Sequence, residues 1–173
     1  MKIACVTSQK RGEIDRLLSE VAEKLQANGK SLIGIVKVPE YESRFENGCD
    51  MKVRVLPEGP VIQITQDLGE GSNACRLDPG AIAAAVKEVE TGQTANAGLF
   101  ILNKFGPEEA SGRGFVSAIG QAVEQGVPVL VGVGAASRAA FDSFAGGLAE
   151  TLPDDLDTIL DWCDAAMSSD FGA

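Results

Sequence analysis

The residues of this sequence best suited to chemistry directly follow short apolar runs. Asn103 and Lys104 come after residues 99–102, a run typical of a strand buried on both faces, and are predicted to lie in the turn that leaves it. Lys10 and Arg11 follow an earlier apolar run in the same way. Ligands of open α/β sheets bind beyond the carboxyl ends of the strands. The pattern therefore predicts a binding site for a small anion or a nucleotide at that edge of a sheet.

The candidate binding residues combine basic side chains, hydroxyl and amide groups, and a glycine. An acidic chain, with a net charge of −10, that gathers basic groups at one crevice would attract a small anion. The primary candidates are Ser8, Gln9, Lys10, Arg11, Gly12, Asn103, Lys104 and Arg113. Secondary candidates are Asp67, Cys75, Arg76 and Asp78. Asp78 is also explained as a helix N-cap because a proline follows it, and Arg76 beside Cys75 would favour the thiolate.

Composition excludes several classes of function. The chain has no histidine, which rules out Ser-His-Asp and Cys-His nucleophile systems and histidine metal sites, and we predict no metal site. The acidic net charge argues against nucleic acid as a partner. No apolar run approaches the roughly 20 residues of a membrane helix, so we expect no membrane insertion. The chain starts with a strand-like run and no cleavage pattern, which predicts a cytoplasmic protein.

The four cysteines fall into two pairs of different character. Cys5 lies in a predicted strand and Cys163 in a predicted helix, so both are interpreted as small core residues. Cys49 and Cys75 lie in polar, loop-like segments. They could share a metal or a disulfide, although two thiolates without histidine make a poor zinc site and a neutral buried thiol is the alternative.

Apolar runs that alternate with helical patterns define the expected fold. Strands are predicted over 2–8, 31–38, 99–102 and 127–133, and helices over 14–25, 79–89, 115–123, 137–144 and 156–163. A β-hairpin is expected as an insertion at about 49–66, because alternating residues flank a proline- and glycine-containing turn. The fold class is therefore α/β: a three-layer, open, mostly parallel sheet with helices on both faces, P-loop-NTPase-like or Rossmann-like. We expect one domain over residues 1–173.

The loop after the first strand departs from a P-loop. In the template G-x-x-x-x-G-K-[ST], Gly12 takes the second glycine, while Thr7, Glu13 and Ile14 stand where the first glycine, the lysine and the hydroxyl belong. One of the four positions matches. Lys10 and Arg11, aided by the amides and the dipole of the following helix, could partly compensate for the missing lysine, whereas an ordinary solvated turn is the alternative.

Two stretches resemble known families. Residues 99–109, Leu-Phe-Ile-Leu-Asn-Lys-Phe-Gly-Pro-Glu-Glu, with Val-Pro-Val-Leu-Val at 127–131, look like the Walker B region of the small nucleoside-triphosphate phosphatases of the P-loop class. An Asp-Glu pair stands in that family where this chain has Asn103-Lys104. Residues 66–78, with Asn-Lys-Phe-Gly at 103–106 and Phe-Ala-Gly-Gly-Leu-Ala at 144–149, resemble more closely a bacterial family of domains of unknown function. This resemblance covers nearly the whole chain, and members of that family are associated with molybdate-transport genes.

The resemblance implies phosphate binding without hydrolysis. Asn103 lacks the anionic oxygen that holds a magnesium shell, and Lys104 cannot polarise an attacking water as a glutamate does. We therefore expect a non-hydrolytic domain that binds a nucleotide or a small anion, with an accessory or sensor role linked to molybdate uptake. The alternatives are a nucleotide phosphatase or another enzyme, using Lys104 or Cys75 with Asp67 or Asp78, and a protein-interaction module without a small ligand. A nucleotide with Mg²⁺ is the candidate cofactor, and the protein partner and oligomeric state stay undetermined.

Overall fold

The computed structural model describes residues 1–38, 51–66, 76–92 and 96–168. It contains a seven-stranded sheet with the strand order β4-β3-β2-β5-β6-β1-β7. The strands are β1 (Ile3–Val6), β2 (Leu32–Lys37), β3 (Lys52–Leu56), β4 (Val61–Gln63), β5 (Leu99–Phe105), β6 (Val129–Val133) and β7 (Glu150–Leu152). The helices are α1 (Glu13–Ala27), α2 (Pro79–Thr91), α3 (Pro107–Ala110), α4 (Val116–Glu124), the 3-10 helix η2 (Ala135–Ser137), α5 (Arg138–Ala145) and α6 (Leu156–Ser168).

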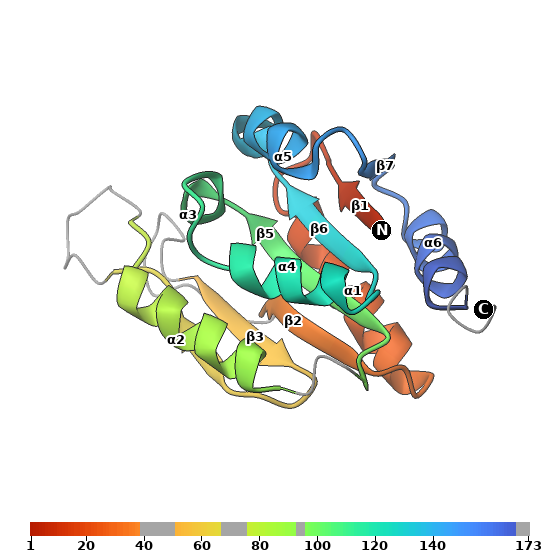
Figure 1. The fold of residues 1–173 in the computed structure, drawn as a ribbon, viewed down its shortest axis with the longest axis horizontal. Helices are drawn as coiled ribbons and strands as arrows, with labels where there is room; N and C mark the ends of the chain where they lie inside the picture. The colour runs from red at the N-terminus through yellow and green to blue at the C-terminus, as the bar shows by residue number, and fades with distance from the viewer. Residues whose placement is uncertain (39–50, 67–75, 93–95, 169–173) are drawn as a thin grey trace.

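The sheet is mostly parallel and is covered on both faces. β2, β5, β6, β1 and β7 run parallel, whereas β3 pairs antiparallel with both β2 and β4. Helices α2, α4 and α5 cover one face through one apolar cluster, and α1 and α6 cover the other face through a second. Figure 1 shows α4 in front of the sheet and α1 behind it. The predicted three-layer α/β class is confirmed.

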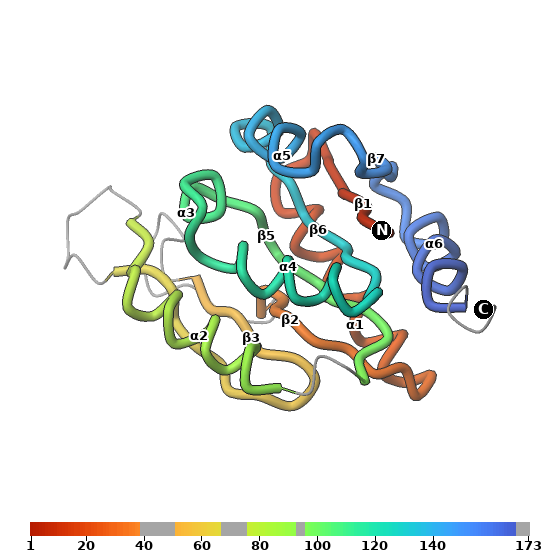
Figure 2. The backbone as a smooth tube through the Cα atoms, in the orientation of Figure 1, coloured from red at the N-terminus to blue at the C-terminus, as the bar shows by residue number. Residues whose placement is uncertain are grey.

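The two edges of the sheet have different origins. The β3–β4 hairpin extends the sheet beyond β2, and β7 forms the opposite edge beside β1. Figure 2 shows the chain path between these two edges. No strand was predicted at Glu150–Leu152, because the segment has only three residues and shows no alternation. In the structure, only the last of these three residues is buried.

The end of β5 corrects one prediction. Asn103 and Lys104 were expected in a turn, but the strand continues to Phe105. The pairing with β6 shifts register between Leu102 and Phe105, which lets Phe105 pair with Val133 and bury its ring. The Asn103–Lys104 peptide bond is cis. The predicted turn is thus a strand end with an irregular register, and the buried phenylalanine beyond the polar pair holds it in the sheet.

Several predicted residues lie outside the described part of the chain. These are Asp67, Cys49 and Cys75. Asp78 is described and caps α2, because its carboxylate accepts hydrogen bonds from the backbone amides of Gly80 (2.9 Å) and Ala81 (3.2 Å). The N-cap interpretation of Asp78 is confirmed. A search of the described residues finds no helix long and apolar enough to cross a membrane.

Cys5 and Cys163 are buried free thiols, as predicted from their apolar neighbours. Burial raises the pKa of the Cys163 thiol to about 12. A thiol reacts as the thiolate. In a variant with Cys49 and Cys75 replaced by serine, we therefore expect neither remaining thiol to react with a thiol reagent at pH 8 until the protein unfolds. Labelling with and without denaturant checks this expectation, and rapid modification of the folded variant would contradict the burial of both thiols.

Candidate functional site

A cavity of about 480 Å³ opens at the carboxyl ends of β2 and β5. It lies between the start of α1, the β3–β4 hairpin, the start of α2 and the segment that follows β5. Its basic lining residues are Arg11, Lys37, Arg76 and Lys104, its acidic ones are Asp15, Glu108 and Glu109, and Asn103 adds an amide. The cavity thus lies at the sheet edge that the sequence predicts, displaced from β1 toward β2.

Three of the predicted cations share this cavity. Arg11 comes from the loop before α1, Lys104 from the end of β5, and Arg76 from the segment before α2. No ion pair joins any of the three to another described residue, whereas the fourth cation, Lys37, lies 3.2 Å from Asp15. An anion is attracted most strongly by cations that no carboxylate neutralises. This arrangement gives the cavity a positive rim.

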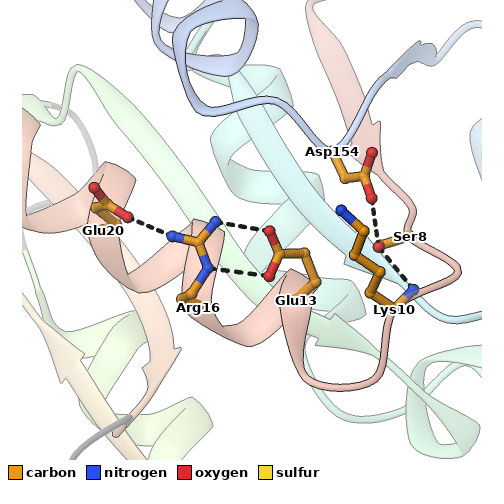
Figure 3. Close-up of polar contacts among 6 residues, drawn as sticks. All are labelled: Ser8, Lys10, Glu13, Arg16, Glu20 and Asp154. Carbon is orange, nitrogen blue, oxygen red and sulfur yellow. Dashed lines mark hydrogen bonds and ion pairs between the residues drawn. The ribbon is translucent and has the colours of Figure 1, made fainter.

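Ser8 and Lys10 take part in a different contact. The Ser8 hydroxyl donates to Asp154 at 2.6 Å and accepts from the Lys10 amide at 3.1 Å (Figure 3). The hydrogen bond from Ser8 and the charge of Lys10 hold the pKa of the Asp154 carboxyl below its ordinary value. Neither residue lines the cavity, nor does Gln9. The loop after β1 therefore already carries a carboxylate of this chain beside its hydroxyl group.

The first turn of α1 is also occupied by an acidic network. Glu13 stands at the position of the P-loop lysine and receives two hydrogen bonds from Arg16, at 2.7 and 3.0 Å (Figure 3). These bonds lower the pKa of the Glu13 carboxyl. Arg16 also pairs with Glu20. A fixed negative charge in the first turn opposes the binding of a phosphate at this helix start. The P-loop position is thus unfavourable for phosphate, although Gly12 next to it lines the cavity.

Arg113 does not join the cavity. Its guanidinium donates to Glu108 at 3.0 Å, and its side chain is 65% exposed. Glu108 lines the cavity and Arg113 does not. Arg113 therefore affects the charge of the cavity only through its ion pair with Glu108. The hydrogen bond from Arg113 lowers the pKa of the Glu108 carboxyl.

Glu109 organises the loop that closes the cavity. Its carboxylate accepts from the amides of Gly106 (3.0 Å) and Phe115 (3.1 Å). Burial raises the pKa of Glu109 above its ordinary value, against these two bonds. A buried carboxyl with a raised pKa in a cavity is a usual sign of an acid or base. Here both oxygens are bound to backbone, which indicates a structural role.

Asn103 is the most unusual polar group of the site. It lines the cavity and is 5% exposed, and neither atom of its amide has a hydrogen-bond partner. Its oxygen lies on the α1 side of the sheet, because a Cβ atom at Gly132 on β6 would lie 2.7 Å from Ile14, 2.9 Å from Leu18 and 3.4 Å from this oxygen. Buried polar atoms in native proteins are almost always paired. Both polar atoms of this amide are therefore buried at a desolvation cost that no hydrogen bond offsets.

The residues of this edge do not fit a protein-held Mg²⁺. Asn103 offers a neutral oxygen where the phosphatase family has a carboxylate, and Mg²⁺ prefers carboxylates and phosphates. Among residues 1–38, 51–66, 76–92 and 96–168, no group of three or more Cys, Asp or Glu side chains is placed to hold a metal.

The apolar wall of the cavity is a feature that was not predicted from the sequence. Its residues come from five elements or their flanks and are Ile35, Met51, Val53, Ile64, Leu77, Ile82 and Phe115. The burial pattern of each element accounts for most of these side chains as core. Their second role, as the lining of one cavity, is visible only in the structure, because it depends on packing between distant parts of the chain.

The sequence and the fold of this chain are similar to those of known proteins. The family described as "Protein of unknown function (DUF2478)" matches residues 3–162. The chain is 32% identical over 153 residues to the Bradyrhizobium diazoefficiens protein "Molybdenum import ATP-binding protein ModC 2", a match that covers 87% of this chain and only 17% of that protein. The solution structure of a human cancer-related nucleoside triphosphatase is 12% identical, with a TM-score of 0.64 over 100% of both chains. That likeness confirms the P-loop-NTPase-like fold.

Proposed function

Because this chain belongs to the DUF2478 family, whose description assigns no activity, we propose from its own site that it binds a nucleotide or another small anion without hydrolysing it. The observation that carries this proposal is the meeting of Arg11, Arg76 and Lys104 at one cavity, with no ion pair to a described residue. Cations concentrated in a cleft of an acidic protein raise the local concentration of anions.

The state of the nearby acids supports binding without hydrolysis. Phosphoryl transfer to water needs a group that orients the water and a metal that neutralises the phosphate charge. Asp15 is paired with Lys37, Glu108 with Arg113, and both oxygens of Glu109 accept backbone hydrogen bonds. The end of β5 supplies an amide and an ammonium group in place of carboxylates.

The similarity to part of a molybdenum import protein supports an accessory or sensor role in molybdate uptake. The chain matches 17% of that relative, so the transport activity of the whole relative is not carried over. A domain that reports the presence of an anion to a transporter needs binding and no turnover.

The test is a binding titration of ATP, ADP, GTP, phosphate and molybdate, by calorimetry and by thermal unfolding. A ligand at a hundredfold its Kd adds about 2.7 kcal/mol to the free energy of unfolding. We expect Arg11→Ala and Lys104→Ala each to weaken anion binding about tenfold, because each removes a charge-assisted contact. Lys24→Ala is the matched control, since Lys24 lies in the last turn of α1, at the end opposite Arg11.

Three results would count against this proposal. The absence of binding by every anion of the panel would favour the protein-interaction module. Release of phosphate from ATP or GTP that Glu108→Gln abolishes would favour an enzyme, because Glu108 is an acid that lines the cavity. Equal weakening in Lys24→Ala would place the anion elsewhere.

A further inference from the structure

The cavity has two unlike walls. Arg11, Arg76 and Lys104 form the positive rim. The apolar wall makes up another part of the lining, and the side chains of Ile35, Val53, Ile82 and Phe115 in it belong to the buried core on the α2 face of the sheet. A ligand that fills the cavity therefore meets both charged groups and hydrocarbon.

A bare inorganic oxyanion uses only one of these walls. Phosphate or molybdate is polar on every side, so it would bond to the cations and leave the apolar wall in water. The volume of about 480 Å³ falls within the range of about 300–1,000 Å³ that is typical of cavities for organic ligands. Apolar surface that a ligand removes from water adds to affinity in proportion to its area.

We propose that the ligand of this cavity is an organic phosphate of the nucleoside-phosphate class. Its uncharged body lies on the apolar wall, and its phosphate lies at Arg11, Arg76 and Lys104. This inference rests on the proposed binding function and narrows it, because it excludes the inorganic oxyanions as the ligand that fits best.

The experiment compares four probes by calorimetry on the full chain: inorganic phosphate, molybdate, phenyl phosphate and AMP. We expect the tighter of the two organic phosphates to bind at least about tenfold more tightly than either inorganic anion. Leu77→Ala removes apolar contact from the wall and should weaken that organic phosphate several-fold, while the affinity for inorganic phosphate stays unchanged. Val61→Ala is the control, since Val61 is 53% exposed on β4 and does not line the cavity.

The outcomes separate this inference from the proposal beneath it. If phosphate or molybdate binds as tightly as both organic probes, the inference is overturned and anion binding stands. If Leu77→Ala weakens phosphate and the organic probe equally, the apolar wall does not contact the ligand body and the inference is again overturned. If none of the four probes binds, the binding function itself fails.

Discussion

Gly34→Ala is expected to lower the free energy of unfolding by about 3 kcal/mol or more, the largest effect that we expect from a single substitution. Gly34 lies in the middle of β2 with a φ of +112°, a conformation that side chains rarely adopt. A Cβ atom there would lie 1.9 Å from the carbonyl oxygen of Ile101 on β5. This oxygen belongs to the backbone of the central sheet and cannot turn away. Chemical denaturation of the purified variant measures the loss.

Gly120→Ala is the control for this prediction. Gly120 lies in α4, and beyond its chain neighbours and the backbone of its own helix no atom lies within 4 Å of the position that an added methyl group would take. Alanine should therefore stabilise the helix by about 0.5–1 kcal/mol. The same substitution thus has opposite expected signs at the two sites. A loss of less than about 1 kcal/mol for Gly34→Ala would show that β2 and β5 do not approach each other as described.

Asn103→Leu is expected to raise the free energy of unfolding by about 1–2 kcal/mol. Two unpaired polar atoms are buried in the folded protein, and replacing them with an apolar group of similar size removes their desolvation cost. Chemical denaturation of the purified variant measures this gain.

Ser19→Ala tests the same reasoning at a second position. The Ser19 hydroxyl is also buried without a hydrogen-bond partner, but it lies in α1 and does not line the cavity. Its replacement should also stabilise the protein. A loss of stability in Asn103→Leu would show that the amide has a hydrogen-bond partner in the folded protein.

Local patterns were enough to predict most of the elements. The apolar runs that contain Ile33, Ile101 and Val131 were correctly interpreted as buried parallel strands, and Asp78 was correctly interpreted as the N-cap of α2. The strand end at Asn103 was missed because polar residues after an apolar run usually signal a turn. What keeps the strand going is the burial of Phe105 against the ring of Phe141, at 5.4 Å, and the sequence does not show that contact.

The site was predictable only as an edge of the sheet. Strand order places Arg11 and Lys104 at one edge, and the structure brings them to one cavity. The direction of a long side chain depends on its nearest opposite charge, and for Arg113 that is Glu108. The loop that carries Ser8 and Lys10 contacts Asp154. Asp154 lies far along the chain, and no sequence pattern indicates this contact.

The place of β1 in the sheet has a consequence for how the chain folds. β1 lies between β6 and β7, with Ile3 opposite Val129 and Ala4 opposite Glu150. Among the described strands, β1 therefore pairs only with two that lie far along the chain. Closing so long a stretch of chain costs entropy before any contact is gained, and proteins dominated by such distant pairings fold slowly. We therefore expect the loop that precedes α1, and with it Arg11 at the cavity, to take its final place late in folding.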